Sequence, residues 1–207
     1  KQQFATVSFM AAEADRELER LLAALGRTAS QMNIEVLASN AEIERFLKDR
    51  PVLLNQFNGG LIVIGADGIA RAEVPAAARR VGINYNFLEP VGSALNDGKA
   101  SISSPRFDHS LQTPVFSMTA PIRDEHGTVV GVLAGIVDLS RPNILDQIIE
   151  RRYGESGFYL LEDPRTRRIV TATVLFFGSI RQVPTTRPST RTMAGIRPFL
   201  LAINGAC

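Results

Sequence analysis

Asp138 is the acidic residue whose position in this sequence points most directly to binding chemistry. It stands at the end of an apolar run, Thr128–Leu139, that is typical of a buried β-strand. A neighbouring strand is entered close to Arg106, so opposite charges are expected at the rim of one sheet. Such a pair beside an apolar surface indicates a small-molecule site. Two alternatives stay open: Asp138 caps a helix near Pro142, or it forms a structural ion pair with Arg106.

Two aromatic residues, Tyr85 and Phe87, stand among polar neighbours in the loop passage of residues 75–98. Aromatic side chains in such a loop are typical of a recognition surface, although they would equally cover one edge of a sheet. Together with residues of the central strands they make up the candidate ligand contacts. These contacts are Tyr85, Phe87, Arg106, Phe116, Met118 and Asp138.

The sequence offers no catalytic, metal-binding or cofactor-binding motif. It contains no Gly-x-Ser-x-Gly elbow, no phosphate-binding Gly-x-x-x-x-Gly-Lys loop and no Gly-x-Gly-x-x-Gly turn. His109 and His126 lie in a loop and a turn without metal-ligand spacing. The single cysteine, Cys207, allows no internal disulfide. We therefore expect a fragment that is not an enzyme and that binds no metal or cofactor.

Composition and charge narrow the classes of partner. Apolar residues make up 45% of the 207 residues, which is ample for a core, and no apolar run approaches the ~20 residues of a membrane span. The net charge is +2, but seven arginines and no acidic residue follow Asp163, so the preceding part is acidic. This balance argues against nucleic acid binding. The chain starts at Lys1 without an initiator Met, and we expect a fragment of a longer protein.

Runs of apolar residues bounded by turn residues predict two groups of strands. The first is a hairpin, with strands at residues 61–65 and 69–74 joined by the turn Ala66–Gly68. The second comprises the strands Ala100–Phe107, Pro114–Arg123 and Thr128–Leu139, the last two joined by a tight turn that ends at Gly127. Along the middle strand, alternation places Phe116, Met118 and Ala120 on one face and Val115, Ser117 and Thr119 on the other.

Helices are predicted at both ends of this region. Residues 1–50 are mostly helical, with a second helix at Ala41–Lys48 that Asn40 caps and Pro51 follows. The first helix carries a heptad-like apolar stripe that either packs along the domain or pairs with a copy of itself. The stripe comprises Leu18, Leu22, Leu25, Ala29, Met32 and Val36. Shorter helices are expected at Ala76–Arg80 and Arg141–Tyr153.

The first hairpin recurs about 97 residues later. Gly157–Leu161, an acidic turn and a returning strand at residues 168–170 repeat the order of apolar strand, turn and strand seen from Gly60 to Val74. This echo predicts that a second copy of the same module begins near Gly157. The resulting domains are an N-terminal helix and connector at 1–50, a ligand-binding module at 51–153, and a partial or divergent module at 154–207.

The order of these elements resembles the double Cache family, whose extracytoplasmic sensor domains contain PAS-like modules. The resemblance rests on a set of short motifs spread over residues 1–173. These motifs are residues 61–68 (LIVIGADG), 80–84 (RVGIN), 96–99 (NDGK), 102–104 (ISS), 114–124 (PVFSMTAPIRD) and 127–139 (GTVVGVLAGIVDL). The implied fold is α+β, with a long N-terminal helix packed on a five-stranded antiparallel sheet and the start of a second similar module.

The resemblance also implies a function and a location. It implies a periplasmic domain of an inner-membrane receptor that binds a small molecule in the first module and controls a cytoplasmic output domain, such as a diguanylate cyclase or sensor kinase. In relatives that bind amino acids, an acid at the position of Asp138 holds the ligand's ammonium group. The loop before the central strands, Tyr85–Val91, lacks the Arg and Trp of those relatives, so the ligand stays open.

One alternative function shares the same fold. The chain would then be a structural or dimerising module whose pocket is vestigial and whose N-terminal helix forms a homodimer interface. Ligand binding separates the two hypotheses, because only a sensing domain is stabilised by a small molecule.

Overall fold

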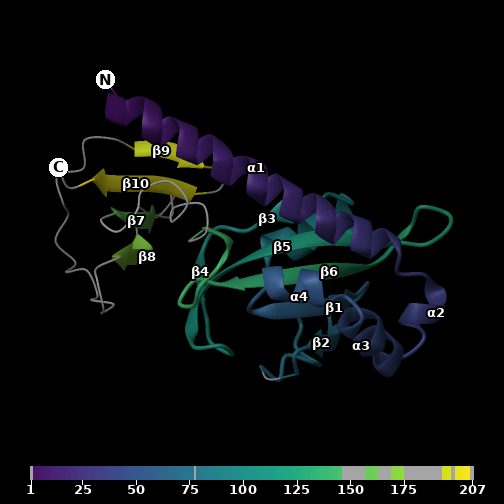
Figure 1. Ribbon diagram of the computed structural model, residues 1–207. Helices are drawn as coiled ribbons and strands as arrows, with labels where there is room; N and C mark the ends of the chain where they lie inside the picture. The colour runs from purple at the N-terminus through teal and green to yellow at the C-terminus, as the bar shows by residue number, and fades with distance from the viewer. Residues whose placement is uncertain are drawn as a thin grey trace. The chain divides into compact units, whose positions relative to one another are not determined.

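The computed structural model describes residues 2–76, 78–145, 157–162, 169–174, 193–196 and 199–205 (Figure 1). The chain divides into two compact units. The main unit, which carries the larger sheet, comprises Glu19–Ser103 and Phe107–Arg141. The second unit comprises Lys1–Leu18, Ser104–Arg106 and Pro142–Cys207. The domain boundaries expected from the sequence stay predictions.

The larger sheet has the strand order β2-β1-β6-β5-β3, and β4 also pairs with β5. Its strands are β1 (Gly60–Gly65), β2 (Ala70–Val74), β3 (Ser101–Ile102), β4 (Arg106–Asp108), β5 (Thr113–Arg123) and β6 (Val129–Asp138). Strand β6 lies at the centre, antiparallel to both β1 and β5. The antiparallel, PAS-like sheet predicted from the sequence is confirmed.

The prediction of one continuous strand at Ala100–Phe107 was wrong, because two short strands, β3 and β4, occupy this stretch. Beyond β3, a side-chain hydroxyl replaces a backbone carbonyl in the hydrogen bonding between the two strands. Ser103 N donates to the Ser117 carbonyl at 2.8 Å, but Ser117 N donates to the Ser103 hydroxyl, also at 2.8 Å. Pro105 then follows without an N–H for pairing, so the strand is interrupted before β4 begins.

The two faces of the sheet are covered by different helices. On one face, the α5 face, Thr119 donates through its hydroxyl to the carbonyl of Pro90 in α5 (Glu89–Asn96) at 3.0 Å. On the other, the α4 face, a Cβ at Gly135 would come within 2.4 Å of Phe57, the C-cap of α4 (Pro51–Gln56). Met118 lies opposite Gly135 and therefore belongs to the α4 face.

Four helices precede the sheet where the sequence predicted two. They are α1 (Gln2–Ser30), α2 (Ile34–Leu37), α3 (Asn40–Lys48) and α4. The cap of α3 is Ser39 rather than Asn40, because the Ser39 hydroxyl accepts a hydrogen bond from Glu42 N at 3.2 Å. Pro51 does follow α3, but it also opens α4, where a missing N–H costs no helical hydrogen bond.

The buried stripe of α1 runs along Leu18, Leu21, Leu25 and Ala29, and the buried Met32 follows the end of the helix. Leu21, rather than the predicted Leu22, lies on this stripe, and Val36 is only half-buried. In Figure 1 the C-terminal half of α1 runs along the larger sheet, as expected for the helix that covers it. Across the described helices, no segment is both long and apolar enough to cross a membrane.

The passage after β2 is a loop that adds to the edge of the sheet. Ala70 N donates to Ile83 O at 2.9 Å, and Tyr85 N donates to Gly68 O at 2.8 Å. The described residues of Ala76–Arg80 are not helical, contrary to the prediction. The backbone explains the difference: Arg79 has a φ of 53°, outside the helical region, and Arg80 N donates to Glu73 Oε2 at 3.1 Å instead of to a helical carbonyl.

The second unit contains a smaller sheet with the order β8-β7-β10-β9. Its strands are β7 (Gly157–Glu162), β8 (Ile169–Val174), β9 (Met193–Ile196) and β10 (Phe199–Gly205). The order matches β2-β1-β6-β5, since each hairpin is followed in space by the last strand and then the strand before it. The expected second module therefore has the same strand arrangement. The predicted helix Arg141–Tyr153 lies mostly outside the described residues.

Replacing Gly135 with Ala should destabilise the main unit. The new Cβ would lie 2.4 Å from the Phe57 ring, and overpacking of this kind costs about 1–3 kcal/mol. We expect a lower melting temperature in a circular dichroism melt. Gly26→Ala is the matched control, because no atom lies within 4 Å of that added Cβ and Ala is favoured in a helix. Equal melting temperatures for the two variants would contradict the packing described.

Candidate ligand-binding site

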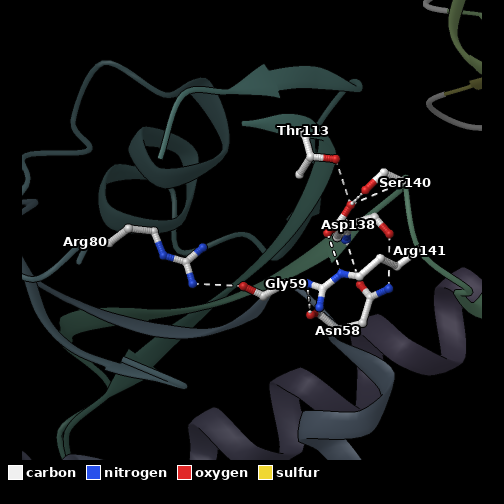
Figure 2. A network of polar contacts seen from close by, with 7 residues as sticks. All are labelled: Asn58, Gly59, Arg80, Thr113, Asp138, Ser140 and Arg141. Carbon is white, nitrogen blue, oxygen red and sulfur yellow. Dashed lines mark hydrogen bonds and ion pairs between the residues drawn. The ribbon is translucent and has the colours of Figure 1, made fainter. Parts of the chain in front are cut away.

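Asp138 ends β6 on the α5 face, and its carboxylate is enclosed by hydrogen-bond donors (Figure 2). Its Oδ1 accepts hydrogen bonds from the Thr113 hydroxyl at 2.9 Å and from the Ser140 backbone N and hydroxyl at 2.9 and 2.7 Å. Its Oδ2 accepts a hydrogen bond from Arg141 Nε at 2.7 Å. The chain thus turns around this carboxylate as it leaves the sheet.

These donors keep Asp138 ionised. Burial by itself would raise the pKa of the carboxyl, but hydrogen bonds from Ser140, Arg141 and Thr113 outweigh it and hold the pKa below the ordinary 3.8. The side chain of Asp138 is 6% exposed, whereas that of Arg141 is 56% exposed. The site therefore holds a buried negative charge whose cationic partner, the Arg141 side chain, is more than half exposed.

Asn58 joins this carboxylate group to the start of β1. Its amide nitrogen donates to Asp138 O at 3.1 Å, and its amide oxygen accepts from Asp138 N at 2.7 Å. Its backbone carbonyl accepts from Arg141 Nη2 at 2.8 Å. Asn58, Asp138 and Arg141 thus form a closed triangle of contacts, here called the Asn58 triangle, that links residues 83 positions apart.

A second acid–base pair lies at the same end of the sheet, where β2 ends and β1 begins. Arg80 Nε donates to Glu73 Oε2 at 2.8 Å, and Arg80 Nη2 donates to Gly59 O at 2.9 Å. Both side chains are 1% exposed. Glu73 Oε1 and Arg80 Nη1 are buried without a hydrogen-bond partner. Through the Gly59 carbonyl, this pair holds the loop after β2 against the residue that precedes β1.

The α5 face also carries a buried apolar cluster. Strands β1, β2, β5 and β6 contribute to it, and so do the loop and α5 that cover this face. Its members are Ile62, Ile64, Ala70, Tyr85, Val91, Ala94, Val115, Val132, Ala134 and Ile136. Asp138 and Thr113 supply the polar groups at its end.

The candidate residues from the sequence separate in the structure. Asp138 and Tyr85 lie on the α5 face, and Phe87 is 73% exposed while its ring stacks on Tyr85 at a centroid distance of 6.3 Å. Phe116 and Met118 are fully buried on the α4 face, on the other side of the sheet from Asp138.

Arg106 begins β4, is half-buried and is assigned to the second unit, so its ion pair with Asp138 stays a prediction. Cation ligands are not gathered anywhere in the described ranges, which hold no cluster of three His, Cys, Asp or Glu residues.

Five residues of this region were missed in the sequence: Asn58, Glu73, Arg80, Thr113 and Arg141. Glu73 carries no usable signal, because in the strand Ala70–Val74 it alternates with small and apolar residues just as the exposed Arg71 does. Asn58 and Arg141 carry none, because their contacts join positions that only the sheet brings together.

The structure of this chain is similar to several solved ligand-binding domains. One is the domain of the Pseudomonas aeruginosa amino acid chemoreceptor PctC in complex with GABA, with a TM-score of 0.62, 18% identity, and coverage of 98% of this chain and 96% of that chain. Another is the domain of the Pseudomonas fluorescens chemoreceptor CtaA with L-valine, with a TM-score of 0.62, 15% identity, and coverage of 97% and 93%.

A third is the domain of the Pseudomonas aeruginosa amino acid chemoreceptor PctB with L-Arg, with a TM-score of 0.61, 14% identity, and coverage of 94% and 88%. No family model and no curated protein sequence matches the chain. At these identities the likeness establishes the fold, which the chain shares with these ligand-binding domains and which confirms the Cache-like fold expected from the sequence.

Breaking the Glu73–Arg80 pair should cost far more than breaking an exposed pair. Arg80→Met leaves a buried carboxylate uncompensated, and such losses reach about 3–5 kcal/mol. Urea unfolding measures this loss. Arg71→Met, which removes the half-exposed Arg71–Asp67 pair of the same hairpin, is the control and should cost about 1 kcal/mol or less. The double variant Glu73→Leu/Arg80→Met should recover most of the stability; no recovery would show that the pair itself is not the cause.

The stabilising contribution of Asp138 should depend on pH. Because the folded pKa lies below the ordinary 3.8, the ionised carboxylate stabilises the folded state above that value. This contribution is lost as the pH falls through the lower, folded-state pKa. Urea unfolding of the wild type and of Asp138→Asn, from neutral pH down to about pH 2, should give curves that converge at the acid end. A constant difference across this range would contradict the pKa direction.

Proposed function

We propose that this chain is the extracytoplasmic small-molecule sensing domain of a membrane signal-transduction receptor. The observation that carries the proposal is the fold: both sheets follow ligand-binding domains over nearly the whole chain, with 98% coverage for the PctC domain. Those domains were solved with small molecules, and none of the three is described as catalytic. A sensing role also fits a sequence without a nucleophile and base in a recognisable motif.

The α5 face is where we place the ligand. Tyr85 and the apolar cluster provide a nonpolar surface, and Asp138 provides an ionised carboxylate at its end. GABA, L-arginine and L-valine, the ligands of the structural neighbours, all carry an amino group that is positively charged at neutral pH. We assign to Asp138 the contact with a ligand's ammonium group, and to Tyr85 and Phe87 further contacts at the same site.

Phe116 and Met118 are left out of this site because they belong to the α4 face. There they pack in the interior and have a structural role. Their truncation is expected to reduce stability by a cavity effect without a selective loss of ligand affinity.

The finer features of the receptor follow from the same proposal. The parent protein would be anchored in the inner membrane, with the chain on the periplasmic side and a diguanylate cyclase, kinase or chemotaxis domain in the cytoplasm. A homodimer through α1 would carry the response across the membrane. The alternative, a structural module with a vestigial pocket, predicts the same fold but no ligand.

A thermal-shift measurement on the 207-residue chain tests the proposal. The compounds are L-valine, L-arginine and GABA, each compared with an amine-free analogue such as isovalerate or butyrate. Binding at about 100 times the dissociation constant adds roughly 2.7 kcal/mol, so a rise of about 5 °C or more is expected for a compound that binds.

Asp138→Asn should lose this rise, whereas Arg45→Gln should keep it. Arg45 is an exposed residue of α3 whose side chain pairs with Glu42, and its replacement changes the net charge without touching the α5 face. If no amine-bearing compound raises the melting temperature, the sensing proposal fails and the structural alternative stands.

A further inference from the structure

The cationic partner of Asp138 belongs to the chain itself, and its position is the starting point of a further inference. Arg141 Nε donates to Asp138 Oδ2 at 2.7 Å. The other three donors to the carboxylate all bind Oδ1, and they come from Thr113 and Ser140. Oδ1 is thus already saturated with donors, so an incoming cation approaches Oδ2, the oxygen to which Arg141 donates.

The two partners of this ion pair differ sharply in burial. The Asp138 side chain is 6% exposed, and its position is fixed by the strand, by Thr113 and by Ser140. The Arg141 side chain is 56% exposed and reaches the carboxylate from solvent. A ligand cation can replace such an exposed side chain at low cost. The Arg141 guanidinium regains hydration on release, and Asp138 keeps its Oδ1 donors.

Arg141 also connects the carboxylate to the point where the chain leaves the main unit. Through Nη2 it binds the Asn58 carbonyl at 2.8 Å, which closes the Asn58 triangle (Figure 2). Arg141 is the last residue of the main unit, and Pro142 is the first residue of the next segment of the second unit. Release of Arg141 from Asp138 would therefore loosen one of the places where the chain passes from the main unit to the second.

By contrast, the Glu73–Arg80 pair at the same end of the sheet is sealed. Both of its side chains are 1% exposed, and Arg80 is held in addition by the Gly59 carbonyl. Its exchange for an external cation would require the loop after β2 to open. Of these two pairs, only the one formed by Asp138 has a partner that a ligand can replace from solvent.

We infer that Arg141 is a built-in competitor for the ligand: its guanidinium occupies the position on Asp138 that the ligand's ammonium group takes, and ligand binding releases Arg141 from both Asp138 and Asn58. This inference rests on the proposed function. In this role Arg141 sets the ligand concentration at which the site fills. Its release on binding changes the contacts at the point where the chain exits the main unit.

Competition has a measurable consequence. When the binding-competent state is only a fraction of the population, the apparent dissociation constant rises by the inverse of that fraction. If Arg141 occupies Asp138 about nine-tenths of the time, its removal strengthens binding about tenfold. Amine-free compounds do not compete for Oδ2, so their affinity does not rise.

Isothermal titration calorimetry of the 207-residue chain with L-valine, L-arginine and GABA tests this point. Arg141→Gln should bind the amine-bearing compounds about tenfold more tightly than the wild type, while Arg141→Lys, which keeps a cation on the arm, should stay closer to the wild type. Arg45→Gln controls for the change in net charge and should leave the affinity unchanged. Circular dichroism melts establish that each variant is folded.

The outcomes separate this inference from the proposed function. Unchanged or weaker binding of amine-bearing compounds by a folded Arg141→Gln, with binding by the wild type intact, overturns the competitor role and leaves the sensing function standing. Absence of binding by both proteins overturns the sensing function, and the inference with it.

Amide hydrogen exchange supplies a second readout, which a purely structural role of Arg141 would not produce. In the wild type, saturating ligand should speed exchange at Asp138 N, and Arg141→Gln should show the faster exchange without ligand. Asp138 N is the reporter because it donates to Asn58 Oδ1, and Arg141 holds Asn58 through its carbonyl. Ser140 N is the internal control because its acceptor, Asp138 Oδ1, keeps its donors. If amide exchange at this reporter slows or stays constant when ligand binds to the wild type, the proposed release of Arg141 is overturned.

Discussion

The register of β6 between β1 and β5 is the constraint on which the candidate site depends. It sets Asp138 opposite Val115 and Ile136 opposite Gly60. Because successive side chains point to opposite faces, a slip of one residue would turn Asp138 to the α4 face and separate it from Thr113. The end of the strand is held by the Asn58 amide, which binds both backbone groups of Asp138. The hydrogen bonds that fix the strand are therefore also those that place the carboxylate.

Charge at this end of the sheet is balanced in two different ways. Glu73 and Arg80 neutralise each other inside the protein, where the loss of either partner leaves an isolated buried charge. Asp138 is balanced by an exposed arginine, so its partner is exchangeable. The first arrangement fixes the loop that leads to Tyr85, and the second leaves the site responsive to cations. Rigidity and responsiveness are thus assigned to different pairs of residues on one face.

Local patterns in the sequence predicted most of the sheet. The hairpin of β1 and β2, the long strands β5 and β6 and the second hairpin all follow from runs of apolar residues and from turns that contain Asp, Gly or Pro. The errors share a physical origin. The strand expected at Ala100–Phe107 is divided because a serine hydroxyl replaces a backbone acceptor. The helix expected at Ala76–Arg80 is absent because the Arg80 backbone N–H donates to the Glu73 side chain instead of to a helical carbonyl. In both cases a tertiary contact outweighs local propensity.

The sequence by itself determined the class of fold, the absence of recognisable catalytic motifs and the importance of Asp138, because these follow from periodicity and from residue type. It placed Phe116 and Met118 on the face opposite Ser117 and Thr119, but it did not determine which of these faces carries the site. Only the tertiary structure decided that Asp138 shares the α5 face with Tyr85, that Glu73 pairs with Arg80, and that Arg141 occupies the carboxylate. The physical reason is distance along the chain: the Asn58 triangle joins positions 83 residues apart, and no local pattern encodes a contact that exists only after β6 has found its place between β1 and β5.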